Sequence, residues 1–180
     1  MKIVIYGAES TGKTWLAKNL AKNLDTVWVP EYAREFLQKK YDETGNVCSY
    51  DDLMPIARGQ IRLENQAQKE AKKDLIFCDT NPLQTYYYGR AYFPNFDHPE
   101  LWDLAINRHY DFYFLTYIDI PWEEDDLRDK PEEREEMHQL FENSLKENNL
   151  PYLLLKGNKK ERLEKAIDKI NQLRKLNANI

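Results

Sequence analysis

The fold is decided by the stretch Gly7-Ala8-Glu9-Ser10-Thr11-Gly12-Lys13-Thr14. It fits the pattern G-x-x-x-x-G-K-[ST] of a phosphate-binding P-loop. Before it, Lys2–Tyr6 is a short apolar run rich in β-branched residues, as is typical of a buried parallel strand. After it, Leu16, Leu20 and Leu24 recur every four residues and mark one face of a helix. Strand, glycine loop and helix follow in the order that the motif requires, so the context supports the match.

The chemistry of such a loop follows from its backbone and from two side chains. Glycines let backbone N–H groups turn inward around phosphate oxygens, and the N-terminus of the next helix adds partial positive charge. Lys13 would reach the β- and γ-phosphates, and the hydroxyl of Thr14 would ligate Mg²⁺. Every residue of the loop, from Gly7 to Thr14, is therefore a candidate contact of the cofactor. The alternative is a glycine-rich turn with a chance lysine, but the flanking strand and helix favour a protein that binds a nucleoside triphosphate with Mg²⁺.

Composition limits the classes of protein that the chain can belong to. It has 180 residues, 42% of them apolar, which is enough to build the core of one domain. The net charge of −5 argues against non-specific binding of nucleic acid, which needs a basic face. Cys48 and Cys78 form neither a disulfide framework nor a metal-binding pattern. No signal peptide is recognisable, and no run reaches the roughly 18 apolar residues of a membrane span. We expect one cytoplasmic domain over residues 1–180 that binds neither nucleic acid nor membranes.

Apolar runs alternate with helical patterns along the chain. The strand candidates are Lys2–Tyr6, Thr26–Val29, Leu75–Cys78, Phe112–Leu115 and Tyr152–Leu155. The helix candidates are Lys13–Leu24, Tyr32–Tyr41, Tyr50–Lys72, Pro82–Ala91, Pro99–His109, Pro131–Asn148 and Lys159–Leu176. Such alternation predicts an α/β fold in which a five-stranded parallel sheet carries helices on both faces. Ligands bind beyond the carboxyl ends of the strands in such sheets, so the residues that follow each strand are the candidate site.

Three charged residues follow the second and third strands. Glu31 could bind ribose hydroxyls or orient a nucleophilic hydroxyl, or it could be an ordinary carboxylate at a helix N-terminus. Arg34, one turn later, could contact substrate or phosphate, although a solvated arginine is the simpler interpretation. Asp79 ends an apolar strand, as in a Walker-B motif whose carboxylate holds Mg²⁺ directly or through water. With a P-loop upstream, the pattern favours this role for Asp79.

The segments after the last two strands offer further candidates. A phosphotransferase would carry a mobile lid at about 119–148, although the acidic run Glu123–Asp126 could equally be a solvated loop. Arg134 either neutralises a transferring phosphoryl group or is solvated, and no glutamate lies three or four residues away to form a helix-face ion pair with it. Gly157 and Asn158 either let backbone groups approach an adenine ring or simply join strand to helix.

Motifs along nearly the whole chain also form a recognisable series. GAESTGKT is followed by PEYARE (30–35), IARGQ (56–60), FCDT (77–80), YDFYFLT (110–116), DIPWEEDDLRD (119–129), REEMHQLF (134–141) and the segment 151–165. In this order they resemble the ribosylnicotinamide kinase domain of NadR-type proteins. The P-loop alone is generic, whereas the combination of PEYARE with DIPW…LRD is much more specific to that family.

The resemblance implies a fold like that of nucleoside and nucleotide kinases, and a reaction. The γ-phosphoryl group of ATP would pass to the 5′-hydroxyl of nicotinamide riboside and give nicotinamide mononucleotide. Lys13 and the P-loop amides would hold the phosphates, while Thr14 and Asp79 would hold Mg²⁺. Arg128 and Arg134 would close over the transferring phosphoryl group.

The same resemblance implies the residues that face the nucleoside. Glu31 would contact the ribose or accept the proton of the 5′-hydroxyl, and Arg34 and Asp79 are further candidate substrate contacts. Trp122 would either face the nicotinamide ring or pack under the lid.

Two departures from the family qualify this expectation. A glycine usually stands in the family where this chain has Asp126, which could alter the lid loop or its ligand contacts. The chain also begins at the kinase strand, so we expect neither synthesis of NAD from the mononucleotide nor repressor activity. The alternatives are a kinase for another nucleoside or small alcohol, and a P-loop regulatory module that hydrolyses ATP slowly. Substrate-dependent release of ADP would separate these possibilities.

Overall fold

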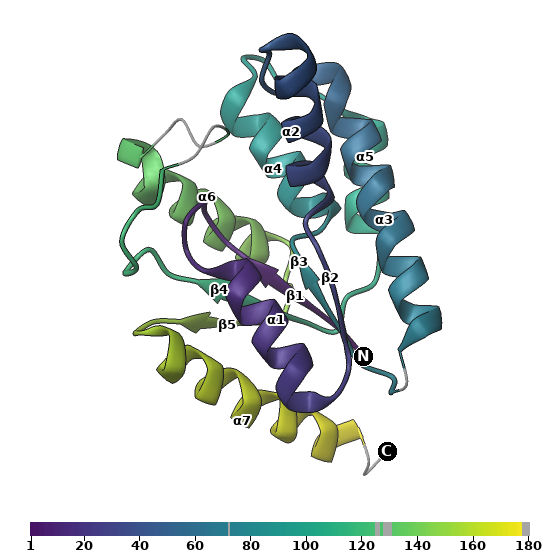
Figure 1. The fold of residues 1–180 in the computed structure, drawn as a ribbon, viewed down its shortest axis with the longest axis vertical. Helices are drawn as coiled ribbons and strands as arrows, with labels where there is room; N and C mark the ends of the chain where they lie inside the picture. The colour runs from purple at the N-terminus through teal and green to yellow at the C-terminus, as the bar shows by residue number, and fades with distance from the viewer. Residues whose placement is uncertain (72, 125–126, 128–130, 178–180) are drawn as a thin grey trace.

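A parallel sheet of five strands forms the centre of the computed structural model (Figure 1). The model describes residues 1–71, 73–124, 127 and 131–177, with only the backbone of 131 and 177. The strand order is β2-β3-β1-β4-β5, and each neighbouring pair is parallel. The strands are β1 (Lys2–Tyr6), β2 (Val27–Val29), β3 (Ile76–Asp79), β4 (Phe112–Thr116) and β5 (Tyr152–Leu155). The sequence-based prediction of the fold class is confirmed, and the bounds of β1 and β5 are those predicted.

Seven α-helices and two short 3₁₀ turns lie in the described part of the chain. The helices are α1 (Lys13–Leu24), α2 (Tyr32–Thr44), α3 (Leu53–Glu70), α4 (Pro82–Tyr92), α5 (Pro99–Ile106), α6 (Arg134–Glu147) and α7 (Lys159–Asn177). The predicted helix over 50–72 begins as a 3₁₀ turn, η1 (Tyr50–Asp52), where the side chains and backbones of Ser49 and Asp52 form a capping box. A second 3₁₀ turn, η2 (Pro131–Glu133), precedes α6.

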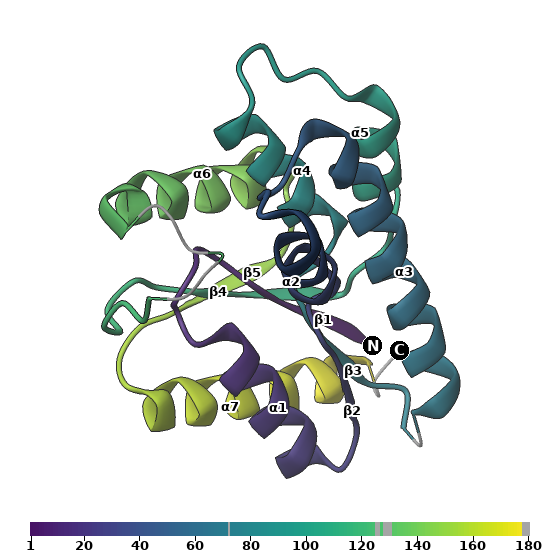
Figure 2. The ribbon, with the colours of Figure 1, turned by 45° about the horizontal axis from the view of Figure 1, so that its top comes forward.

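The two faces of the sheet are covered by different helices (Figure 2). Because side chains alternate along a strand, Ile3 and Ile5 of β1 point to one face and Val4 and Tyr6 to the other. Ile3 and Ile5 pack with α1 and α7, whereas Val4 and Tyr6 pack with the layer that contains α4 and α6. All five residues of β1 are buried, as expected of a strand at the centre of a doubly covered sheet.

Helix α2 lies outside these layers and rests on α3. None of its residues is fully buried. Its contact with α3 is close at Gly59, where an added Cβ would lie 2.0 Å from the ring of Tyr32. A residue with any side chain at position 59 would therefore push the two helices apart.

Parallel pairing brings the carboxyl ends of the strands to one edge. Ile5 of β1 lies beside Asp79 of β3, so the P-loop and the predicted Walker-B acid begin next to each other. Gly7 follows β1 with φ of 137°, and a Cβ there would lie 2.7 Å from the Thr116 hydroxyl at the end of β4. Glycine is therefore required at this position both by its backbone conformation and by the lack of space. In the described part of the chain, each helix is too short or too polar to cross a membrane.

Candidate active site

The P-loop connects β1 to α1 and is held in shape by its own side chains. Gly12 starts α1 with φ of 80°, a left-handed conformation that favours glycine. The Thr11 hydroxyl lies 2.8 Å from the Ala8 carbonyl oxygen and 2.7 Å from the Thr116 hydroxyl. The Lys13 ammonium donates to the same Ala8 oxygen at 2.8 Å. A phosphate that entered the loop would compete with this neutral carbonyl for Lys13, because hydrogen bonds between ions are stronger.

Thr14 and Asp79 meet beside the loop. The Thr14 hydroxyl donates to Asp79 Oδ2 at 2.5 Å. Asp79 Oδ1 is buried and has no hydrogen-bond partner among the described residues. Burial, and then the negative charge of Glu31, raise the pKa of Asp79 to about 7, although Lys13 and Thr14 oppose that shift. The site thus holds a buried carboxylate oxygen that a cation, a proton or a hydrogen-bond donor of a ligand could satisfy.

These two side chains fit a magnesium ion that arrives with a nucleotide. Mg²⁺ prefers oxygen ligands and usually binds one or two protein groups together with phosphates and waters. Thr14 Oγ1 and Asp79 Oδ1 supply such oxygens next to the phosphate loop. Among the described residues, no group of three or more His, Cys, Asp or Glu side chains could hold a metal by itself. The donor set therefore suits Mg²⁺ bound to ATP better than a permanent protein-bound metal.

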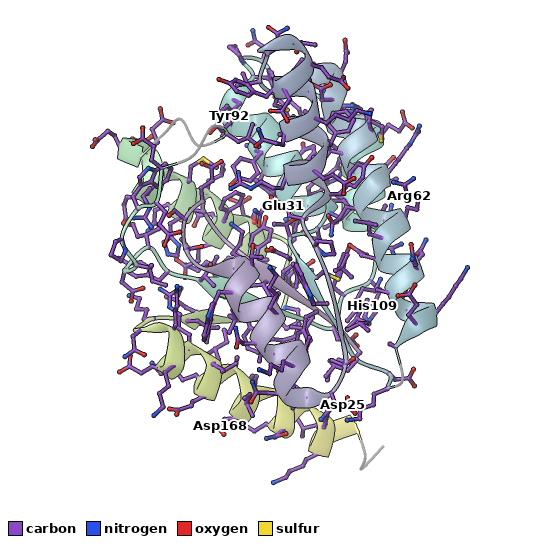
Figure 3. The ribbon with its side chains drawn as sticks, viewed as in Figure 1. Asp25, Glu31, Arg62, Tyr92, His109 and Asp168 are labelled. Carbon is purple, nitrogen blue, oxygen red and sulfur yellow. The ribbon has the colours of Figure 1, made fainter. Side chains whose placement is uncertain are left out.

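Glu31 stands at the N-cap of α2, directly after β2. Figure 3 labels it at the base of α2, near the carboxyl edge of the sheet. The next residue, Tyr32, donates its backbone N–H to Gln60 Oε1 at 2.8 Å, which fixes the start of α2 against α3. Glu31 and Asp79 line the same cavity, and the negative charge of Glu31 helps to raise the pKa of Asp79.

A cavity of about 590 Å³ joins these groups. Its polar part is formed by the P-loop from Glu9 to Thr14 and by the side chains that follow the strands, and its other part is apolar and aromatic. The polar residues beyond the loop include Glu31, Arg34, Gln60, Asp79, Thr80 and Gln84, and the apolar ones include Leu37, Val47, Leu53, Ile56, Tyr88, Tyr92 and Phe93. Tyr92 ends α4 on the side remote from the sheet (Figure 3). A cavity lined both by phosphate-binding groups and by apolar and aromatic side chains suits a nucleoside beside ATP.

The start of the lid region is attached to the P-loop. Arg134 Nη2 donates to the carbonyl oxygens of Ser10 at 3.2 Å and Ile120 at 3.0 Å. The backbone N–H of Glu123 donates to the Ser10 hydroxyl at 2.7 Å. Arg134 is therefore fixed between loop and lid and does not extend freely into solvent.

Of the predicted lid residues, Trp122 packs beside Arg134. The Arg134 guanidinium lies 5.6 Å from the centre of the Trp122 ring. Trp122 is not among the residues that line the cavity, so its position favours packing under the lid over contact with a substrate ring. Arg128 and Asp126 lie outside the described residues, and their roles stay predictions.

Arg162, on the first turns of α7, is a residue that the sequence argument missed. It is 3% exposed and donates to the carbonyl oxygens of Gly157 (2.8 Å), Thr11 (2.7 Å) and Tyr117 (2.9 Å). The signal was present, because Arg162 stands four residues before Ala166 and eight before Ile170, both fully buried. An arginine on the apolar stripe of a helix needs acceptors in the interior.

Gly157 and Asn158 support this end of α7. Gly157 donates its backbone N–H to Asp119 Oδ2 at 2.7 Å. The side chain of Asn158 accepts from the backbone N–H groups of Lys160 and Glu161, which caps the helix. Lys159 lines the cavity, whereas Gly157 and Asn158 do not, so their predicted contact with ATP stays a prediction.

Comparison with known proteins shows the family of this chain. A family model described as an AAA domain matches residues 2–162. The chain belongs to this AAA-domain family. Two curated proteins similar to this chain are the trifunctional NAD biosynthesis/regulator proteins NadR of Salmonella typhimurium and Escherichia coli. Each is 29% identical, over 86% and 84% of this chain, and the chain spans only 38% and 37% of their lengths.

Solved structures with a fold similar to that of this chain include a NadR protein and two kinases. A NadR protein in complex with NR has a TM-score of 0.80 at 23% identity, over 95% of this chain and 48% of that one. Deoxyadenosine kinase from M. mycoides has a TM-score of 0.73 at 17% identity, over 96% of this chain and 100% of that one. Thymidylate kinase from Ehrlichia chaffeensis has a TM-score of 0.68 at 15% identity, over 94% and 98%. At these identities the likeness concerns the fold.

Two buried glutamines of the AAA domain also line the cavity without having been predicted. They are Gln60 on α3 and Gln84 on α4. Helical periodicity separates apolar from polar faces, but it does not indicate which polar residues turn inward. Only the tertiary structure brings these amides to the candidate site.

Proposed function

We propose that this chain is a nicotinamide riboside kinase that transfers the γ-phosphoryl group of Mg²⁺-ATP to the 5′-hydroxyl of the riboside. One observation carries the proposal. A single cavity joins the P-loop, with Lys13 and Thr14, to the carboxylates of Glu31 and Asp79 and to an apolar, aromatic end. Phosphate binding, proton acceptance and enclosure of a ring are the three tasks of a nucleoside kinase. The similarity to NadR relatives and to a NadR structure with NR supports this choice of nucleoside.

The residues would divide the reaction among them. The loop amides and Lys13 would bind the β- and γ-phosphates, and Thr14 and Asp79 would hold the metal. Bound Mg²⁺ would neutralise charge on the phosphates. Glu31 would accept the proton of the 5′-hydroxyl as the oxygen attacks phosphorus. Arg134, with Arg128, would balance charge on the transferring group, while Arg34 and the cavity walls would hold the nucleoside.

A second candidate is a kinase for another nucleoside or small alcohol. The likeness to deoxyadenosine kinase and thymidylate kinase favours this alternative over a regulatory module that hydrolyses ATP slowly. For either kinase function, we propose that the protein is cytoplasmic and that it binds neither nucleic acids nor membranes.

The deciding experiment measures ADP release with a panel of nucleosides. We expect nicotinamide riboside to stimulate ADP formation far more than adenosine, cytidine or thymidine. If an uncharged nucleoside gives the highest rate, the substrate is wrong but the kinase stands. If no nucleoside stimulates ADP release, the kinase function is rejected in favour of the regulatory module.

A further inference from the structure

Gln84 lies on the first turn of α4 and reaches across to the start of the P-loop. Its side chain is 1% exposed. Gln84 Oε1 accepts the backbone N–H of Gly7 at 3.2 Å. A backbone N–H can only donate, so this bond fixes which end of the amide faces the loop. The amide nitrogen, Nε2, must therefore point away from Gly7.

The amide nitrogen of Gln84 lacks a hydrogen-bond partner among the described residues. Gln84 Nε2 is buried and finds no hydrogen-bond acceptor among the described residues. An unpaired buried donor destabilises a fold, so proteins rarely keep one without a use. Gln84 also lines the cavity that holds the P-loop and Asp79. A ligand in this cavity is the available source of the missing acceptor.

The position of Gln84 within the cavity narrows the choice of acceptor. Its amide is tied to Gly7, and Gly7 follows β1, whose Ile5 pairs with Asp79. The amide thus lies beside the phosphate-binding and acidic groups. Many of the apolar residues of the cavity come from α2, α3 and the end of α4, while Trp15 and Trp28 come from α1 and β2. In a nucleoside bound with its 5′-hydroxyl toward the P-loop and its ring in the apolar part, the ribose lies between these two regions.

We propose that Gln84 donates a hydrogen bond from Nε2 to a secondary hydroxyl oxygen of the acceptor ribose, and that it thereby selects ribosides over deoxyribosides. This inference rests on the proposed function as a nucleoside kinase. Gln84 has two tasks in this arrangement. Its carbonyl oxygen holds the first residue of the P-loop. Its amide NH₂ group binds the sugar and thereby positions the sugar relative to that loop.

The test compares the effect of one substitution in the protein with the effect of one missing hydroxyl in the substrate, as in a double-mutant cycle. Wild type and Gln84→Met are assayed for kcat/KM with nicotinamide riboside and with its 2′-deoxy and 3′-deoxy analogues. The Gly7 contact is lost in the variant with every substrate, so its effect cancels when the riboside and an analogue are compared. We expect wild type to prefer the riboside over one of the analogues by roughly tenfold or more, and Gln84→Met to lose most of that preference. Gln172→Met, at an exposed position of α7, is the control and should keep the wild-type preference.

A second measurement covers the case in which Gln84→Met does not fold. In ¹⁵N-labelled wild type, the side-chain amide resonances of Gln84 should shift when the riboside binds and shift less with the decisive deoxy analogue. Equal preference for the hydroxyl in wild type and folded Gln84→Met would overturn the inference while the kinase function stands. The inference would also be overturned if the Gln84 amide resonances shifted equally with the riboside and with both analogues. If wild type phosphorylates no nucleoside at all, the proposed function fails, and the role of Gln84 fails with it.

Discussion

Arg162 and Asp119 form an ion pair that joins α7 to the segment after β4. The other carboxylate oxygen of Asp119 accepts the backbone N–H of Gly157 at 2.7 Å, and Arg162 also holds the Thr11 carbonyl at 2.7 Å. One guanidinium group therefore connects the P-loop, the start of the lid region and the turn after β5. Arginine suits this role because its planar group donates in several fixed directions.

The first prediction concerns this junction. Arg162→Met should destabilise the protein by about 1–3 kcal/mol, because the partly exposed carboxylate of Asp119 and three carbonyl oxygens lose their donor. It should also raise KM for ATP more than KM for the nucleoside, since Thr11 belongs to the phosphate loop. Denaturant unfolding and steady-state kinetics measure the two effects. Lys175→Met, at an exposed position on the same helix, is the control. A loss of stability with both KM values unchanged would leave Arg162 a purely structural residue.

The second prediction concerns the P-loop lysine. Lys13→Ala should abolish phosphoryl transfer while leaving the fold intact, because its charge is needed as the bond between the β- and γ-phosphates breaks. Nucleoside-dependent ADP release and a thermal melt provide the measurements. Lys22→Ala changes an exposed lysine of the same helix and should be fully active. Near-normal turnover in Lys13→Ala with unchanged ATP affinity would contradict the P-loop assignment.

The third prediction follows from the pKa of Asp79, which burial and Glu31 raise to about 7 from an ordinary 3.8. Between these two values the folded protein binds more protons than the unfolded chain, so stability falls as pH rises through this window. Asp79→Asn is neutral at every pH and should remove this part of the slope. The free energy of unfolding of wild type and Asp79→Asn is measured at about pH 5 and about pH 8, in the presence of a chelator. The change between the two pH values is then compared for the two proteins. Equal slopes in the two proteins would show that Asp79 does not titrate in this range.

The fourth prediction separates two roles of Glu31. Glu31→Gln should keep ATP binding but lose about 10²-fold or more in turnover, as expected when a positioned base is removed. Glu35→Gln, one turn away and exposed, is the matched control. If turnover persists and only the nucleoside KM rises, Glu31 binds the ribose without acting as a base. If neither constant changes, Glu31 is an ordinary N-terminal carboxylate of α2.

The fold could be predicted from the sequence because its central elements carry strong local signals. Lys2–Tyr6 is continuously apolar and is followed by a loop whose pattern has a backbone mechanism, so β1, the P-loop and α1 were predicted with their observed bounds. The 3₁₀ turn at Tyr50–Asp52 was not separated from α3, since apolar periodicity does not distinguish the two types of helix there.

The candidate site was predictable only where its residues follow strands. Topology sends every such residue to one edge, which is why Glu31 and Asp79 were found. Gln60, Gln84 and Arg162 stand inside helices, and their inward orientation depends on packing between segments far apart in the chain. From the sequence alone, a polar residue on a helix is predicted to face solvent. This prediction is wrong when groups in the protein interior form hydrogen bonds with the residue.

The outer position of α2 has a consequence for how this protein can change. Ala33, Arg34 and Leu37 of α2 line the cavity, yet the helix contributes no fully buried residue and rests on α3 where Gly59 leaves room for Tyr32. Substitutions along this helix can therefore reshape one wall of the cavity at little cost to the core. This wall can vary more freely than Gln84 and the other buried residues, which leaves evolution, or a designer, free to alter the wall while conserving the fold.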